Sequence, residues 1–169
     1  MTATDAETRL AGIAAAPGLA VGPAHRLRLA EATVQRRQVA DPAAELLRLN
    51  DARRAARGEL EALQAHVAAT VSPAEAEIFE AHLVFLDDPS LFDEVEASCR
   101  AEGCNVEAAL ATVVDGYKAM LLESDDELFR ARAADLEDIK QRLLRLLGAG
   151  GGGVNMPAEP VVLLATDLL

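Results

Sequence analysis

The sequence has no tryptophan, one tyrosine and four phenylalanines, so aromatic residues make up only 3% of its 169 residues. A hydrophobic core must therefore be built from Leu, Ala, Val and Ile, which supply most of the 51% hydrophobic content. Chains rich in Ala and Leu, with many Glu and Arg, are rich in strong helix formers. The composition favours a mainly helical protein, and the length suffices for one compact core and a small appendage.

Cysteine and long apolar runs are scarce as well. Cys99 and Cys104 are too few for a disulfide framework, and their spacing misses the Cys-x-x-Cys pattern of zinc and redox sites. No apolar run is long enough to span a bilayer, and the first residues lack the basic and hydrophobic regions of a signal peptide. We therefore expect a cytoplasmic protein with reduced thiols and no membrane insertion.

Positive charge is also in short supply, with 16 Lys and Arg against 28 Asp and Glu and a formal net charge of -12. Nucleic-acid binding depends mainly on neutralising phosphates with Lys and Arg, so this balance argues against it. A basic protein partner fits the charge better, because opposite fields speed encounter. The alternative is that the charge serves only solubility, and charge alone leaves both interpretations open.

Helix-start signals recur along the middle of the chain. They are Asp, Ser or Asn residues placed to cap a helix, several of them followed by proline or, three residues on, by Glu. The predicted starts are Asp41 with Pro42, the capping box of Ser72 and Glu75, Asp88 with Pro89, Asn105, and the capping box of Ser124 and Glu127. The predicted ends are about Leu86, about Arg100 before Gly103, Leu122, and Gly148.

Apolar residues recur at helical spacing in the longer of these segments. Helices with short connections favour an antiparallel bundle of two hairpins, which we place at residues 41–147. The expected stripes consist of Leu46, Leu49, Leu60 and Leu63 in the first helix, Ile78, Leu83 and Leu86 in the second, and Phe129, Leu136, Ile139, Leu143, Leu144 and Leu147 in the last.

Both ends of the chain depart from the helical pattern. Residues 1–11 are a polar start that we expect to be disordered. Residues 12–24 are small and apolar around Pro17-Gly18, which predicts two short strands about a turn, and residues 160–165 have a buried-strand pattern. Segments 12–30 and 154–169 would be partial strands of a truncated α/β domain, into which the helical domain is inserted.

A glycine-rich linker is predicted at residues 148–153. Glycine runs can cradle phosphate, but a P-loop ends in Lys followed by Ser or Thr and opens a helix. Here the run is followed by Val154, Asn155 and Met156 instead. A phosphate loop is therefore not assigned.

Four blocks, in order, resemble enzyme I of the bacterial phosphoenolpyruvate:sugar phosphotransferase system. The opening block is similar to that family's first strand-turn-strand, two blocks are similar to its second-helix and last-helix signatures, and the final block resembles a strand of its phosphohistidine domain. The blocks are residues 12–22 (GIAAAPGLAVG), 78–89 (IFEAHLVFLDDP), 132–139 (RAADLEDI) and 161–168 (VVLLATDL).

The resemblance implies a transferase that takes phosphate from phosphoenolpyruvate onto a histidine and passes it to a histidine-containing phosphocarrier protein. It implies that the end segments belong to a phosphohistidine domain, that the phosphorylated histidine lies beyond this sequence, and that this fragment alone is inactive. It also implies magnesium and a homodimer through a C-terminal domain in the full-length enzyme, with no cofactor and no metal site in this fragment.

The resemblance further places a phosphocarrier-docking surface on the helical domain. Apolar anchors ringed by carboxylates suit a basic partner, and a glycine within a helix allows close backbone approach. The alternative is that the apolar members are core and the acidic ones a solvated face or a helix cap. The implied residues are Ile78, Glu80, His82, Val84, Phe85, Asp88, Gly116, Leu121 and Arg132.

No catalytic residue is assigned. His25 follows a predicted strand and His66 lies near the end of the first long helix, while His82 has no Arg, Lys or glycine-rich loop near it in sequence to bind phosphate oxygens. The sequence also departs from the family, which often has acidic residues at the positions of Pro73, Ala74 and Ser90, and in some members a basic one at Glu137. Two alternatives stay open: a non-catalytic helical bundle for protein interaction or oligomerisation, and an enzyme I paralogue in nitrogen regulation or dihydroxyacetone phosphorylation.

Overall fold

The computed structural model describes residues 12–13, 17–26, 34–149 and 157–165. The chain divides into two compact units, one formed by its middle and one by its two ends. The predictions for residues 1–11, and for most of the glycine-rich linker, lie outside the described residues. Within the part of the chain that is described, none of the helices combines the length and apolar composition that crossing a bilayer requires.

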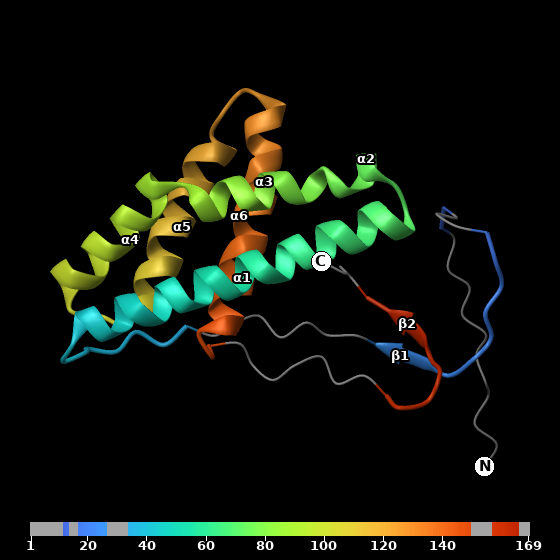
Figure 1. The fold of residues 1–169 in the computed structure, drawn as a ribbon, viewed down its shortest axis with the longest axis horizontal. Coiled ribbons are helices and arrows are strands. Elements are labelled where there is room, and N and C mark those ends of the chain that lie inside the picture. The colour runs from blue at the N-terminus through green and yellow to red at the C-terminus, as the bar shows by residue number, and fades with distance from the viewer. Residues whose placement is uncertain (1–11, 14–16, 27–33, 150–156, 166–169) are drawn as a thin grey trace, which may run out of the picture. The chain divides into compact units, whose positions relative to one another are not determined.

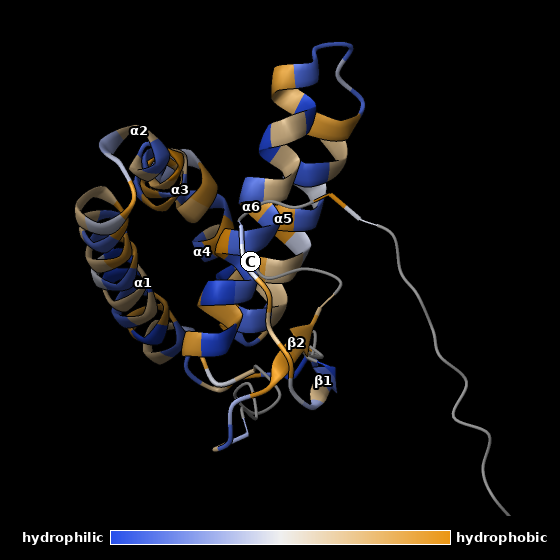
Figure 2. Ribbon diagram, turned by 90° about the vertical axis from the view of Figure 1, so that its right-hand side faces the viewer, coloured by the Kyte–Doolittle hydropathy of each residue, from blue (hydrophilic) through white to orange (hydrophobic). Residues whose placement is uncertain are grey.

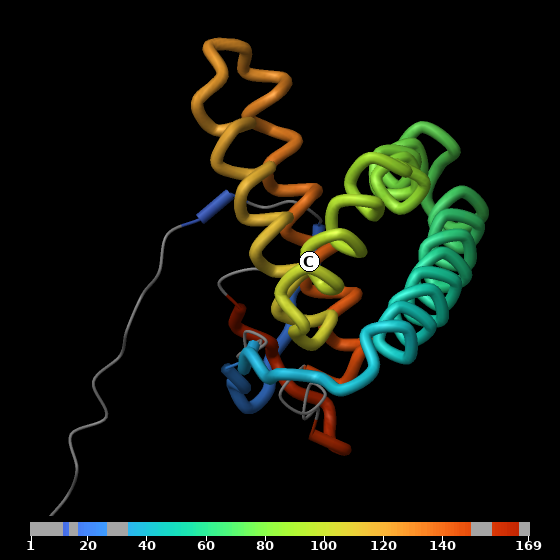
Figure 3. Tube along the Cα trace, turned by 90° about the vertical axis from the view of Figure 1, so that its left-hand side faces the viewer, coloured from blue at the N-terminus to red at the C-terminus, as the bar shows by residue number. Residues whose placement is uncertain are grey.

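The middle unit is helical and forms two hairpins (Figures 1 and 3). In the first hairpin α1 packs against α2 and α3, and in the second α5 packs against α6, while α4 continues from α3 and packs on α5. The predicted mainly helical bundle of two hairpins is confirmed. The helices are α1 (Pro42–Thr70), α2 (Pro73–Ala76), α3 (Ile78–Asp87), α4 (Pro89–Glu102), α5 (Val106–Leu122) and α6 (Glu127–Leu146).

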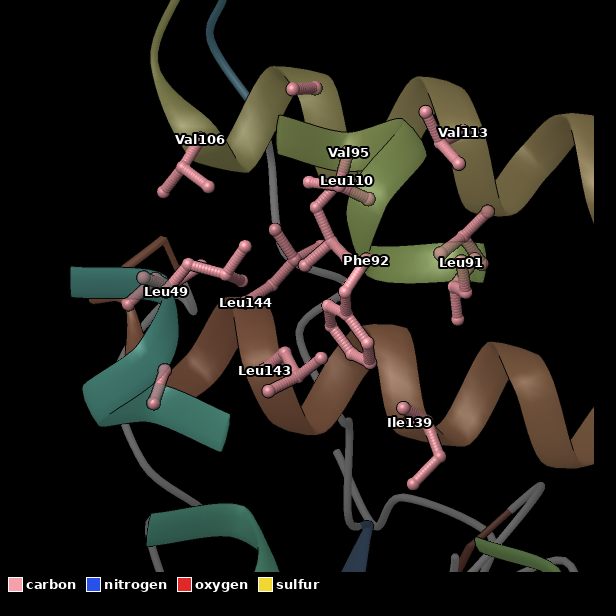
Figure 4. Packing of buried hydrophobic residues seen from close by; sticks show 14 of the residues in the cluster. Leu49, Leu91, Phe92, Val95, Val106, Leu110, Val113, Ile139, Leu143 and Leu144 are labelled. Carbon is pink, nitrogen blue, oxygen red and sulfur yellow. The ribbon is translucent and has the colours of Figure 1, made fainter. Parts of the chain in front are cut away.

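One hydrophobic cluster joins α1, α3, α4, α5 and α6. Phe92 points from α4 towards Leu143 and Ile139 of α6, and its side chain is almost fully buried (Figure 4). Apolar and polar residues alternate along α1, α5 and α6, so each of these helices presents only part of its surface to this cluster (Figure 2). Burial of each large aliphatic side chain stabilises the fold by about 1.5–3 kcal/mol.

Local capping signals explain most of the helix boundaries. The Asp41 carboxylate accepts hydrogen bonds from the N–H groups of Ala43 and Ala44, and Ser72 Oγ accepts from Glu75 N at 3.2 Å. Asp88 caps α4 in the same way, through Ser90 N at 2.8 Å. At the other ends, Gly103 and Gly148 adopt positive φ angles of 57° and 86°, which glycine tolerates best.

Three details of the predicted helices are wrong: the undivided second helix, the cap of the last helix and the cap predicted at Asn105. The second predicted helix is divided, because the backbone at Glu77 changes to i→i−3 hydrogen bonds, from Glu77 N to Ala74 O and from Glu80 N to Glu77 O. The last helix is capped by Asp126, whose carboxylate accepts from Leu128 N at 2.8 Å. Ser124 instead accepts from Asp126 N, so it shapes the preceding turn.

The start of α5 is held by a buried polar network that links distant segments. Asn105 precedes α5, but its side chain makes no cap hydrogen bond to that helix. It accepts from Arg37 N and donates to Gln35 O and to Glu107. The free N–H of Val106 is instead satisfied by Glu45 of α1, at 3.0 Å.

Arg48 completes this network from α1. It donates to Glu107 at 2.6 Å, to Glu45 at 2.7 Å and to the carbonyl of Leu147 at 2.9 Å. Burial alone would raise the pKa of Glu107, but the hydrogen bond from Arg48 helps to lower it. The network therefore ties the incoming segment and the end of α6 to one point of the core.

In the end unit, the strands β1 (Ala24–Arg26) and β2 (Val162–Leu164) pair in parallel, with Ala24 opposite Val162. The expected short strands at both ends are confirmed, but the two strands predicted within 12–24 are not both present. Residues 17–23 form no strand, since Pro17 and Pro23 have no backbone N–H to donate.

Candidate docking surface

Helix α3 leaves much of its apolar surface exposed. Seven of its ten residues are apolar, yet only Leu86 is fully buried. Ile78 and Val84 are 58% and 68% exposed, and Glu80, one turn before Val84, is exposed as well. Phe85 is half-buried and packs against the edge of the hydrophobic cluster. Ile78 is thus not part of the core, contrary to the apolar stripe expected from sequence.

His82 lies half-buried between α3 and α6. Its Nδ1 donates to the carbonyl oxygen of Ile78 at 3.2 Å, and its Nε2 lies 3.7 Å from a carboxylate oxygen of Asp138 on α6. The ring also contacts Phe79, with the ring centroids 6.4 Å apart. Both ring nitrogens thus face protein groups, and His82 links α3 of the first hairpin to α6 of the second.

Asp88 lies where α3 meets α4 and faces α5. A hydrogen bond to Glu94, together with burial and the charges of Glu94 and Asp88, raises the pKa of Tyr117. Tyr117 in turn follows Gly116, and both line an open hollow of about 700 Å³ between α4 and α5. A Cβ at Gly116 would meet nothing within 4 Å, so that glycine borders open space.

The other two predicted residues lie towards the loop of the α5–α6 hairpin. Leu121 is half-buried and packs against the hydrophobic cluster. Arg132 is exposed and pairs with Asp135, one turn along its own helix, at 3.1 Å. The structure thus brings α3 beside α6 at His82. It also brings Asp88 close to Tyr117 of α5. A docking role for the nine residues stays a prediction.

Glu137, which departs from the family pattern, is engaged within the helical unit. It accepts hydrogen bonds from Lys118 and Gln141, each at 2.8 Å, and pairs with the buried Lys140 at 2.9 Å. Burial would raise its pKa, but these hydrogen bonds outweigh burial and lower the pKa to about 2. Its charge is therefore balanced inside α5 and α6.

Sequence reasoning missed an apolar group near the loop of the α5–α6 hairpin. Met120, Leu128 and Phe129 are all exposed, with Phe129 at 55%. The helical period placed Phe129 on the same stripe as the buried Leu136. The stripe is exposed at this end because the α5–α6 hairpin extends beyond α1 and α3, which cover it elsewhere (Figure 3). The sequence signal that could have indicated this exposed group is the pair of adjacent apolar residues, Leu128 and Phe129, in the first turn of α6.

Metal ligands do not gather in the described ranges. There, no three His, Cys, Asp or Glu side chains come close enough together to hold an ion. Within these ranges we therefore assign no magnesium site, and magnesium in the full-length enzyme stays a prediction.

The fold defines a class before any comparison: a helical unit of two hairpins, with a parallel pair of strands made by the chain ends. A family model described as "PEP-utilising enzyme, N-terminal" matches residues 11–132. The chain therefore belongs to this family, and over most of its length it is homologous to the N-terminal part of phosphotransferase-system enzyme I.

Curated relatives extend this assignment. The phosphoenolpyruvate-protein phosphotransferases of Priestia megaterium and Geobacillus stearothermophilus are each 37% identical to this chain, over 93% and 96% of its length. The matched region is 28% of each relative. The chain thus spans somewhat more than a quarter of the proteins that it resembles.

Two solved structures share the fold. The NMR solution structure of an Enzyme I protein is 28% identical, with a TM-score of 0.76, covering 94% of this chain and 65% of that one. The N-terminal domain of "Enzyme 1 - Nitrogen" is 27% identical, with a TM-score of 0.69, covering 89% of this chain and 61% of that one.

Proposed function

We propose that this chain docks a histidine-containing phosphocarrier protein on the helical unit, along α3, its junction with α4, and the facing parts of α5 and α6. One observation carries the proposal: α3 exposes two large apolar residues, Ile78 and Val84, to solvent. Exposed apolar groups ringed by carboxylates suit a partner that is basic and partly apolar. The net charge of -12 supports the same partner.

The name of the relatives indicates the reaction to which docking would contribute. Their name describes transfer from phosphoenolpyruvate to a protein, and they extend far beyond the matched region. We place the phosphorylated histidine and the phosphoenolpyruvate site in that further part of the full-length enzyme, together with the magnesium and the dimer contact. The helical unit would position the carrier, so that transfer becomes a local step instead of a random encounter.

Titration calorimetry with the unphosphorylated carrier of the same organism tests docking directly. Val84→Asp places a charge in the proposed contact, and we expect affinity to fall about tenfold or more because an apolar anchor is lost. Leu47→Asp on α1 is the matched control, since Leu47 is also 68% exposed but lies on another helix. We expect its affinity to stay at the wild-type value.

Equal effects of the two substitutions would overturn the proposal, as would absence of binding by the wild-type chain. Sedimentation of the same samples tests the alternative of a self-associating bundle, which predicts dimers that Val84→Asp disrupts. Repeating the titration with the carriers of the sugar and nitrogen branches assigns the branch, because the true partner should bind more tightly.

A further inference from the structure

The end of α3 has an unfavourable electrostatic arrangement of its own. The C-terminus of a helix carries partial negative charge and leaves carbonyl groups without partners. Here the helix ends in Asp87 and Asp88, and its last turn contains no basic residue. The carbonyl of Leu86 is among the groups without a partner in the helix, and Leu86 itself is buried. Something outside α3 must therefore stabilise this end.

Arg53 of α1 supplies the missing partner. Its Nη2 donates to the carbonyl oxygen of Leu86 at 2.7 Å, and its guanidinium lies 3.6 Å from the ring centroid of Phe92 on α4. A single side chain therefore touches both helices that meet at the junction. Burial lowers the pKa of Arg53, while the nearby carboxylates of Asp87, Glu96 and Asp93 act in the opposite direction.

Arg57, one turn further along α1, holds the same end of α3. It forms an ion pair with Asp87 and a second one with Glu61 of its own helix, at 3.0 Å. The hydrogen bond from Arg57 lowers the pKa of Asp87. Two guanidinium groups from α1 thus offset the negative charge that α3 and its carboxylates place at the junction.

We infer that Arg53 is a positioning residue for the proposed carrier surface: with Arg57, it fixes the α3–α4 junction and so sets the affinity for the carrier without touching it. This inference rests on the proposed function. The last turn of α3 and its cap contain Val84, Phe85 and Asp88, three of the nine proposed docking residues. If that turn is loosened, these residues lose their common geometry, and binding must spend free energy on ordering them.

Arg53→Met in the complete chain tests the inference, because methionine keeps the apolar stem and removes the charge and the donors. We expect carrier affinity in calorimetry to fall about tenfold, as when only a tenth of the molecules hold the binding geometry. Backbone amides of residues 84–88 should exchange faster with deuterium, while those of α5 and α6 keep their rates.

Three further variants separate positioning from general loss of stability. Arg54→Met is the matched control: Arg54 is exposed, pairs with Asp51 one turn away, and should leave affinity and exchange unchanged. Arg53→Lys keeps the positive charge and can still donate to the Leu86 carbonyl, so its affinity should stay within about threefold of wild type. Arg57→Met, at a partly exposed position, should weaken binding about threefold and carries the test if Arg53→Met does not fold.

The inference is overturned if folded Arg53→Met binds the carrier as wild type does, or if amide exchange at 84–88 is unchanged. It is also overturned if Arg54→Met weakens binding equally. Failure of the wild-type chain to bind the carrier has a different signature. That result removes the proposed function and the affinity role of Arg53, and amide exchange still reports whether Arg53 orders the junction.

Discussion

Helices α3 and α5 are both rich in apolar residues, but they use them differently. In α5 six apolar residues are buried, and they include Leu110, Val113 and Val114. In α3 only Leu86 is fully buried, and Ile78 and Val84 face outwards. Composition alone does not distinguish a helix that fills the core from one that offers a surface. Both helices have three helical neighbours, α4, α6 and α1 for α5 and α1, α6 and α2 for α3, but these neighbours leave Ile78 and Val84 of α3 uncovered.

The largest expected effect tests the core side of this comparison. Leu110→Ala removes a fully buried side chain of α5 and should lower the free energy of unfolding by about 3 kcal/mol, through lost burial and the cavity left behind. Denaturant unfolding followed by circular dichroism measures it. The matching change on α3, Val84→Ala, should cost less than about 0.5 kcal/mol because the side chain is already in water. Similar costs at the two positions would contradict the comparison.

A smaller effect concerns charge at the α5–α6 contact. The folded-state pKa of Glu137 is about 2, below its usual 4.5. As the pH falls through about 4.5 the unfolded state binds the proton first, so the contribution of Glu137 to stability, full above that pH, is lost towards about pH 2. The unfolding free energy of wild type should therefore drop more steeply in acid than that of Glu137→Gln.

The two proteins should converge only below about pH 2, where Glu137 becomes protonated in both states. Glu123→Gln, at an exposed position beyond α5, serves as the control and should follow the wild-type curve. A gap between wild type and Glu137→Gln that stays constant from neutral to acid pH would contradict the role given to Lys118, Lys140 and Gln141.

Substitution of two helical glycines sharpens the contrast between core and surface. A β-carbon added at Gly116 in α5 or at Gly58 in α1 would have no atom within 4 Å, so alanine fits at both positions. Each substitution should raise the unfolding free energy by about 0.5–1 kcal/mol, because alanine restricts the unfolded chain and favours helix. Only Gly116→Ala should weaken carrier binding. Equal binding by both variants would remove Gly116 from the proposed surface.

Helix boundaries were predictable from sequence wherever the signal is local. Asp41, Ser72 and Asp88 cap the helices that follow them, because each carboxylate or hydroxyl needs only a backbone N–H two or three residues away. Gly103 and Gly148 end helices for an equally local reason. The two-hairpin bundle follows from these boundaries and the apolar periodicity.

The remaining features depend on residues far apart in the chain. Asn105 turns away from its own helix to bind the backbone at Gln35 and Arg37, and Glu45 takes over its capping role from α1. No local pattern contains that exchange. The exposure of Ile78 could not be predicted from a local pattern either. The helical period shows which residues share a face, but it does not show which other elements cover that face. The candidate surface came from the family resemblance, and its role stays a prediction.

The central claim is that the exposed apolar residues of α3 contact a phosphocarrier. An NMR titration of isotope-labelled chain with the unphosphorylated carrier tests it most directly. The account predicts that amide signals of Val84, Phe85 and Gly116 shift progressively, while those near Leu47 on α1 do not. Unchanged spectra at a large excess of carrier, or shifts confined to α1, would contradict it.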